Sequence, residues 1–112
     1  MATTITTYIP QVQYEHMPPK FITVNQEVLQ RHRVEVIRFA SWADSAVPTL
    51  IQMNLTKWCE TEKGGWCCEH GHKLFHIFEH KFSTDEILIA VFVYITPKHW
   101  TEYCLRFLDN SV

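Results

Sequence analysis

The sequence has 112 residues, of which 46% are hydrophobic and 20% charged, values that fit an ordinary globular chain and argue against a disordered one. Its length suits one domain, over residues 1–112, and is too short for two. Ten Lys and Arg residues against twelve Asp and Glu residues give a net charge of −2. Proteins that bind nucleic acid through its phosphates normally carry a basic excess, so we expect no nucleic-acid partner.

The apolar and cysteine patterns bear on location. The longest apolar run, residues 87–95, is too short to cross a bilayer as a helix. The N-terminus lacks a basic region followed by an apolar core, so no secretory signal is visible. Among the four cysteines, Cys67 and Cys68 are adjacent, which is not typical of a disulfide framework. These features predict a cytoplasmic protein with reduced thiols and no membrane association.

Residues 1–24 are predicted to form an N-terminal strand or extended segment, interrupted at Pro10. Thr23 and Gln26 stand at capping-box spacing and predict a short helix over residues 23–32. Residues 33–40 alternate between apolar and charged side chains, a pattern typical of a strand.

A longer helix is predicted over residues 45–63. Asp44 or Ser45 is a good N-cap, and Pro48 falls in the first turn, where its missing N–H costs little. Apolar residues then recur at helical spacing, and Gly64-Gly65 supplies residues that commonly end a helix. Trp66, directly after the glycines, is expected to be the most exposed tryptophan.

Residues 66–82 fit two patterns. As a helix, they would place His72, His76 and His80 in one row; as a strand, their aromatic and β-branched side chains would suit a sheet. We prefer the strand, paired in a hairpin with residues 87–95. A last helix is predicted to begin at Pro97, capped by Thr96.

This order of elements predicts an α+β fold, a ferredoxin-like sandwich in its standard or a permuted order, with two helices on one face of an antiparallel sheet. The N-terminal strand would take the place that the fourth strand normally holds. The strand over residues 87–95 is apolar on both sides, so both faces of the sheet need cover. Dimerisation of two copies through the second face is the simplest way to supply it.

The segment from Cys59 to His80 concentrates three cysteines and four histidines. On a strand, Cys68, His70 and His72 share one face, and Cys59 or His76 could complete a metal site. Zn²⁺ takes about four N or S ligands, but the spacing matches no standard zinc template. Packing and surface roles for these residues are the alternative. A Cys68–His70 nucleophilic pair is a third interpretation, which no motif supports.

Residues 56–66 (TKWCETEKGGW), followed by a hairpin and the closing helix of residues 102–108 (EYCLRFL), resemble a pattern in small uncharacterised proteins of marine tailed phages. The resemblance covers the C-terminal half of the chain. It implies an origin more than an activity, and it assigns no functional residues.

Three functions follow as hypotheses. The first is a non-catalytic, dimeric protein-interaction module that binds a protein partner. The second is a protein that binds zinc or another transition metal through the segment of residues 59–80. The third is a dimeric ferredoxin-like enzyme with a small-molecule pocket between sheet and helices.

Overall fold

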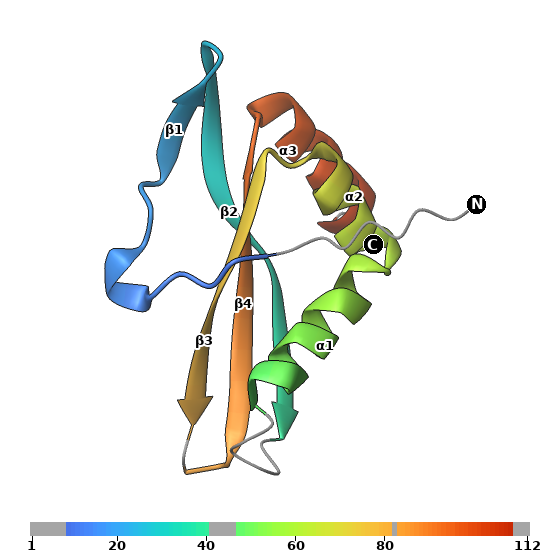
Figure 1. The fold of residues 1–112 in the computed structure, drawn as a ribbon. Coiled ribbons are helices and arrows are strands. Elements are labelled where there is room, and N and C mark those ends of the chain that lie inside the picture. The colour runs from blue at the N-terminus through green and yellow to red at the C-terminus, as the bar shows by residue number, and fades with distance from the viewer. Residues whose placement is uncertain (1–8, 41–46, 82, 109–112) are drawn as a thin grey trace, which may run out of the picture.

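The computed structural model describes residues 9–40, 47–81 and 83–108. They form an α+β domain in which a curled, four-stranded antiparallel sheet of order β1-β2-β4-β3 carries its helices on one face (Figure 1). The strands are β1 (Phe21–Val24), β2 (Glu27–Ala40), β3 (Lys73–Lys81) and β4 (Glu86–Ile95), and the α-helices are α1 (Val47–Cys59), α2 (Glu62–His70) and α3 (Pro97–Tyr103). A short 3-10 helix spans Tyr14–His16, and a π-helical segment, Cys104–Leu108, continues α3. No helix in these described ranges has the length and apolar character needed to cross a membrane.

The predicted short helix over residues 23–32 is wrong, because these residues form the hairpin that joins β1 to β2. Asn25 and Gln26 make its two-residue turn with φ values of 52° and 70°. Two-residue hairpins favour such left-handed residues because their twist matches that of the strands, and Asn tolerates this conformation well. The β-branched and apolar residues on either side then pair as strands. β2 therefore contains the predicted strand over residues 33–40 and extends it backward to Glu27.

The helical region after the second strand consists of two helices rather than one. α1 contains Pro48 in its first turn, as predicted, but it ends at Cys59, and α2 begins at Glu62. Gly64 and Gly65, predicted to end a helix, lie inside α2. A Cβ atom on Gly64 would lie 1.8 Å from the Trp58 carbonyl oxygen, so this glycine allows the two helices to pack closely. The predicted N-caps, Asp44 and Ser45, lie outside the described residues.

The preferred strand over residues 66–82 is confirmed for Lys73–Lys81, which is β3, and wrong for residues 66–70, which complete α2. The predicted hairpin is confirmed, since β3 pairs with β4 in antiparallel register from Lys73↔Tyr94 to Lys81↔Glu86. The last helix begins as predicted, with Pro97 at its first position and the Thr96 side chain accepting a hydrogen bond from the His99 N–H at 3.3 Å.

Only the last part of the predicted N-terminal segment, residues 1–24, lies beside β2, where Phe21–Val24 form β1. Residues 9–12 run beside β3 instead, where the Val12 N–H donates to the His76 carbonyl at 2.8 Å and the His76 N–H donates to the Pro10 carbonyl at 3.0 Å. The part of the predicted strand in residues 1–8 lies outside the described residues.

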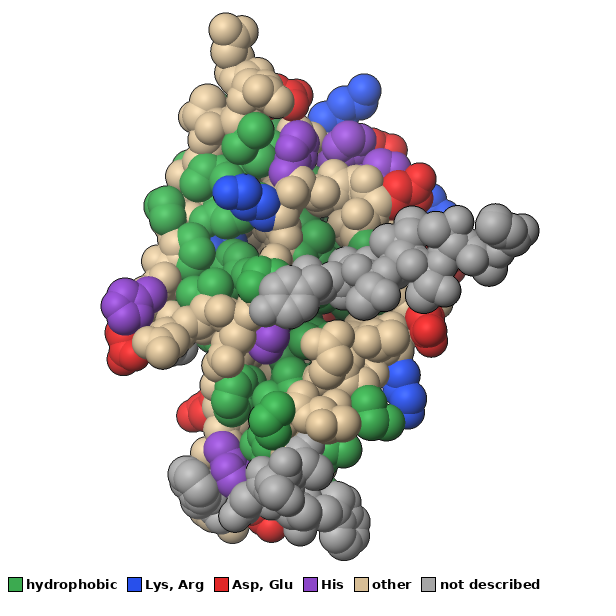
Figure 2. All heavy atoms as spheres, viewed as in Figure 1, with side chains coloured by type: hydrophobic (Ala, Val, Ile, Leu, Met, Phe, Trp, Pro, Cys, Tyr) green, Lys and Arg blue, Asp and Glu red, His purple; other side chains and the backbone are tan. Residues whose placement is uncertain are grey.

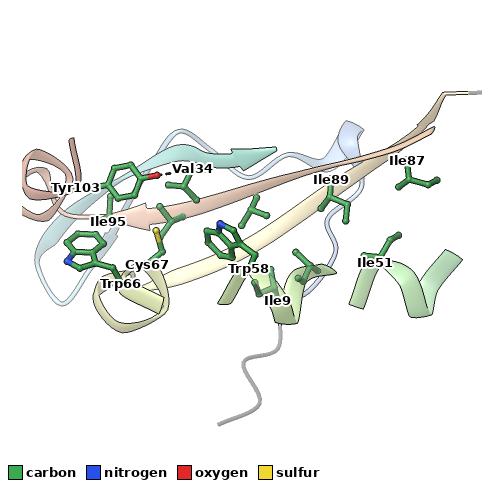
Figure 3. Packing of buried hydrophobic residues seen from close by; sticks show 13 residues of the cluster. Ile9, Val34, Ile51, Trp58, Trp66, Cys67, Ile87, Ile89, Ile95 and Tyr103 are labelled. Carbon is green, nitrogen blue, oxygen red and sulfur yellow. Dashed lines mark hydrogen bonds between the residues drawn. The ribbon is translucent and has the colours of Figure 1, made fainter. Parts of the chain in front are cut away.

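The two faces of the sheet have separate cores. On the helix face, α1 contributes Trp58 and Ile51, α2 contributes Trp66 and Cys67, and the C-terminal helix contributes Tyr103, all against β4 (Figure 3). The opposite face, called here the outer face, has a second cluster of Leu29, Phe75, Phe92 and Tyr94. β4 is thus apolar on both sides, as the sequence predicts. The outer cluster is covered by apolar side chains of the N-terminal segment and β1: Val12, Met17, Ile22 and Val24.

Candidate functional site

The cover over the outer face extends across only part of the sheet. The segment before β1 is fixed there by two hydrogen bonds, from the Arg31 guanidinium to the Pro18 carbonyl and from the Tyr94 hydroxyl to the Pro19 carbonyl. Beyond this segment the face is hollowed into a groove of about 520 Å³. Its lining comes from the three longer strands: Arg33, Val36, Ile77, Phe78, Glu79, Leu88 and Ala90.

Pairing across the three strands arranges the groove in rows. One row is apolar and runs Val36–Ala90–Ile77, with Val36 41% exposed. The next row runs Arg38–Leu88–Glu79, with a cation on one side strand and an anion on the other. Arg38 and Glu79 are both exposed, and neither makes an ion pair within the described part of the chain.

A β-bulge in β2 determines which of its residues face the groove. The register shifts between Arg33 and Glu35, so that two steps along β2 match one step along β4. Val34 and Glu35 therefore both lie on the helix side, where Glu35 forms an ion pair with Lys63 of α2 at 3.7 Å. Bulges leave a backbone group unpaired. The Val34 carbonyl accepts a hydrogen bond from the buried Tyr103 hydroxyl at 3.2 Å (Figure 3).

The structure brings together two of the five predicted metal ligands. The sulfurs of Cys59, at the end of α1, and Cys68, in α2, lie 3.4 Å apart. His70 lies at the end of α2, where its Nδ1 is 3.1 Å from the Trp66 carbonyl oxygen and its ring stacks on Trp66 with centroids 4.4 Å apart. Its nearest imidazole is that of His99, at a centroid distance of 5.2 Å.

The other two predicted ligands lie elsewhere. His72 is exposed just before β3, whereas His76 is only 6% exposed and its Nδ1 donates to the Ile9 carbonyl at 3.0 Å. Burial lowers the pKa of His76, so it is held neutral. Among the described residues, no three or more His, Cys, Asp or Glu side chains are grouped so that they could hold one metal ion. Zinc binding by Cys59, Cys68, His70, His72 and His76 stays a prediction.

The environment of Cys59 and Cys67 disfavours a catalytic role for these two thiols. Burial raises the pKa of the Cys67 thiol to about 12, and burial together with the neighbouring Cys68 raises that of Cys59 to about 12. Catalytic cysteines have the opposite shift, because the thiolate is the nucleophile. Cys68 also contacts Cys59 rather than His70.

Sequence reasoning missed a cluster of stacked rings where α2 ends and α3 begins. His32 of β2 stacks on Trp100 at 3.6 Å, and Trp100 stacks on Tyr103 at 4.9 Å. Figure 2 shows histidine side chains gathered at this end of the molecule. The rings come from elements far apart in the chain, so local spacing gives no sign of the cluster. Trp66 belongs to it and is 7% exposed, so its predicted exposure is wrong.

No protein-family model, curated protein or solved structure matches this chain. The resemblance to small proteins of marine tailed phages therefore stays a prediction.

Proposed function

We propose that the protein is a non-catalytic binding module that forms a homodimer by packing the groove of its outer face against the same groove of a second copy. The observation that carries the proposal is the half-covered outer face, where a partly exposed apolar row lies beside a row with opposite charges at its two ends. Sheets commonly cover such faces by packing on another sheet about 10 Å away.

The charge pattern across the groove is complementary to itself. A two-fold axis that runs parallel to β4, in the plane between two stacked sheets, keeps each row opposite the same row but reverses the strand order. Arg38 then faces Glu79 of the second copy, and the same contact occurs a second time. Leu88 faces its own counterpart on the axis, since it lies between Arg38 and Glu79 in the row. Glu86 lies two residues before Leu88 on the same side of β4, so in this arrangement it would face Glu86 of the second copy. The repulsion between these two carboxylates limits the interface at this end of the groove.

The expected affinity is modest. A stable interface of standard size uses about 20–30 residues from each partner. The groove offers the seven residues that line it together with Arg38. We therefore infer a weak, concentration-dependent dimer, with a Kd on the order of micromolar.

Two observations support a non-catalytic role. The space between sheet and helices, where an enzyme of this architecture would need its pocket, is filled by core side chains such as Leu55, Trp58 and Val91. The raised pKa values of Cys59 and Cys67 also differ from the lowered pKa that a catalytic cysteine needs at neutral pH.

We further infer that the fold is ferredoxin-like and the setting cytoplasmic. Reading β2, β3 and β4 as the first three strands of that fold, their order in the sheet is the expected one, and β1 fills the place of the fourth strand. A fully buried Cys67 that packs as an apolar side chain agrees with a reducing compartment.

Sedimentation velocity over a concentration series, from low to high micromolar, tests the dimer. Wild type should shift from monomer toward dimer as concentration rises. Arg38→Glu and Glu79→Arg should each raise the Kd by at least about tenfold, because each places like charges opposite one another twice. The double variant that exchanges both charges should recover the wild-type Kd.

The matched control is Lys57→Glu, which reverses an exposed charge on α1, away from the outer face, and should leave the Kd unchanged. A wild-type protein that stays monomeric at high micromolar concentration would contradict the proposal. So would a double variant as weak as the single ones, since the two charges would then not face each other.

A further inference from the structure

The corner between α1 and α2 holds a pair of thiols with no role in the proposed dimer. The Cys68 thiol donates a hydrogen bond to the Cys59 sulfur, with the two sulfur atoms 3.4 Å apart. Both side chains are partly exposed, so reagents in solution can reach them. Both are on the helix side of the sheet, whereas the groove is on the outer face.

The sequence positions this pair through the helix corner. Thr61 caps α2 by accepting a hydrogen bond from the Gly64 N–H at 3.0 Å, and its hydroxyl donates to the Trp58 carbonyl at 2.6 Å. The absence of side chains on Gly64 and Gly65 lets the first turn of α2 lie against the last turn of α1. Cys68 follows Gly64 by four residues, one helical turn, so it lies on the same side of α2 and faces Cys59.

We propose that Cys59 and Cys68 are a modification site, at which a disulfide oxidant such as oxidised glutathione converts the two thiols into an intramolecular disulfide that fastens α1 to α2. A disulfide has an S–S bond of about 2.05 Å, so small side-chain rotations are enough to close the distance. The two cysteines are nine residues apart in sequence, and their separation in space is already set by the helix corner.

The reaction proceeds by two thiol–disulfide exchanges. The Cys68 thiolate, after giving its proton to solvent, attacks one sulfur of the oxidant. Its S–S bond breaks, one thiol leaves, and Cys68 carries a mixed disulfide. The Cys59 thiolate then attacks the Cys68 sulfur, and the second thiol leaves. The protein loses two electrons and two protons, and the oxidised reagent becomes two molecules of thiol.

The helix corner brings the two steps together. Because it already holds the two sulfur atoms 3.4 Å apart, Cys59 lies next to the mixed disulfide once this has formed on Cys68. Cys59 gives its proton to solvent as it attacks.

Peptide mapping tests the site directly. The folded protein is treated with oxidised glutathione, its remaining thiols are blocked, and it is digested with trypsin without reduction. Cleavage after Lys57, Lys63 and Lys73 separates Cys59 from Cys68, so the disulfide should join peptide 58–63 to peptide 64–73. Two of the four thiols should be lost, and dithiothreitol should restore both.

Cys68→Ser should abolish the joined peptide, whereas Cys104→Ser, which removes a thiol elsewhere, should leave it intact. If Cys68→Ser does not fold, as judged by circular dichroism, fragmentation of the wild-type joined peptide still tells Cys68 from Cys67. Four free thiols after treatment, a persistent mixed disulfide on Cys68, or a bond through Cys67 would overturn the proposal. Arg38→Glu should form the disulfide as wild type does, so failure of the dimer and failure of this site are separate results.

Discussion

The two sides of β4 are equally apolar but unequally covered. On the helix face, Ile87, Ile89, Val91, Val93 and Ile95 are all fully buried under the helices. On the outer face, Phe92 and Tyr94 are buried by the N-terminal segment and β1, whereas Ala90 and Leu88 are only half-buried. The difference teaches that an apolar strand indicates a need for cover without indicating what supplies it. On the helix face the chain provides the cover itself, and on half of the outer face we propose that a second copy does.

The largest expected difference between the faces is in core packing. Ile89→Ala should lower the free energy of unfolding by about 2–5 kcal/mol, because it removes buried methyl groups and leaves a cavity. Val36→Ala, on the exposed outer face, should change it by less than about 0.5 kcal/mol in the monomer. Urea unfolding of both variants at low micromolar concentration measures the contrast. Equal effects would mean that the outer face is already covered in the monomer.

Two tyrosine hydroxyls extend the comparison, since each donates to a backbone carbonyl on its own face. Tyr103→Phe would leave the buried Val34 carbonyl at the bulge without a partner, which should cost about 1–3 kcal/mol. Tyr94→Phe removes a hydrogen bond to Pro19, an exposed residue that water can solvate, so the cost should be about 0.5–1 kcal/mol. Thermal and urea unfolding of the two variants should rank them in that order. A larger loss of stability in Tyr94→Phe than in Tyr103→Phe would mean that the outer face excludes water better than the helix face.

The sequence predicts an element of the fold correctly where residues close together in the chain specify it, and fails where a contact between distant residues does. The hairpin of β3 and β4 and the start of α3 follow from β-propensity and from Thr96-Pro97, which act within a few residues. Gly64 was misread because its role is a contact with the Trp58 carbonyl, and only the folded corner shows that a Cβ atom would collide there. The turn at Asn25-Gln26 was missed because a capping-box spacing outweighed the strand residues around it.

The candidate site was predictable only in part, for the same reason. The apolar outer side of β4 was visible in the alternation of the strand. The groove was not, because it depends on the bulge at Val34 and on how far residues 12–24 reach across the sheet. Most of the Cys/His segment lies in residues 66–82, for which the sequence predicts one strand, whereas in the structure a helix ends there at His70. Cys59 and Cys68 therefore meet across a corner, and His76 is separated from both.

The next effect in size is a pH dependence that arises on the helix face. His76 has a lowered pKa in the folded protein, so between this value and the unfolded value near 6.5 the unfolded chain binds more protons. The stabilisation is complete above about pH 6.5 and is lost as pH falls toward the folded pKa, with a slope of up to about 1.4 kcal/mol per pH unit.

His76→Asn keeps a side-chain N–H for the Ile9 carbonyl but does not titrate. Its free energy of unfolding should change less between pH 7 and pH 5 than that of wild type. The pH dependence that remains in this variant is expected to include a contribution from His32, because burial also lowers the pKa of His32. An unchanged slope in His76→Asn would show that this imidazole is as accessible to protons in the folded chain as in the unfolded one.

The smallest expected effect concerns how the helix face is held to the sheet. Lys63 and Glu35 form an ion pair of 3.7 Å between α2 and the bulge of β2, with about a third of each side chain exposed. Half-exposed pairs contribute about 0–1 kcal/mol, because water screens the charges and ordering the side chains costs entropy. A double-mutant cycle of Glu35→Gln and Lys63→Gln should therefore give a coupling below about 1 kcal/mol, and 1 M salt should reduce it further. A larger, salt-resistant coupling would mean that charge, rather than the apolar contacts of Trp66 and Tyr103, holds α2 to the sheet.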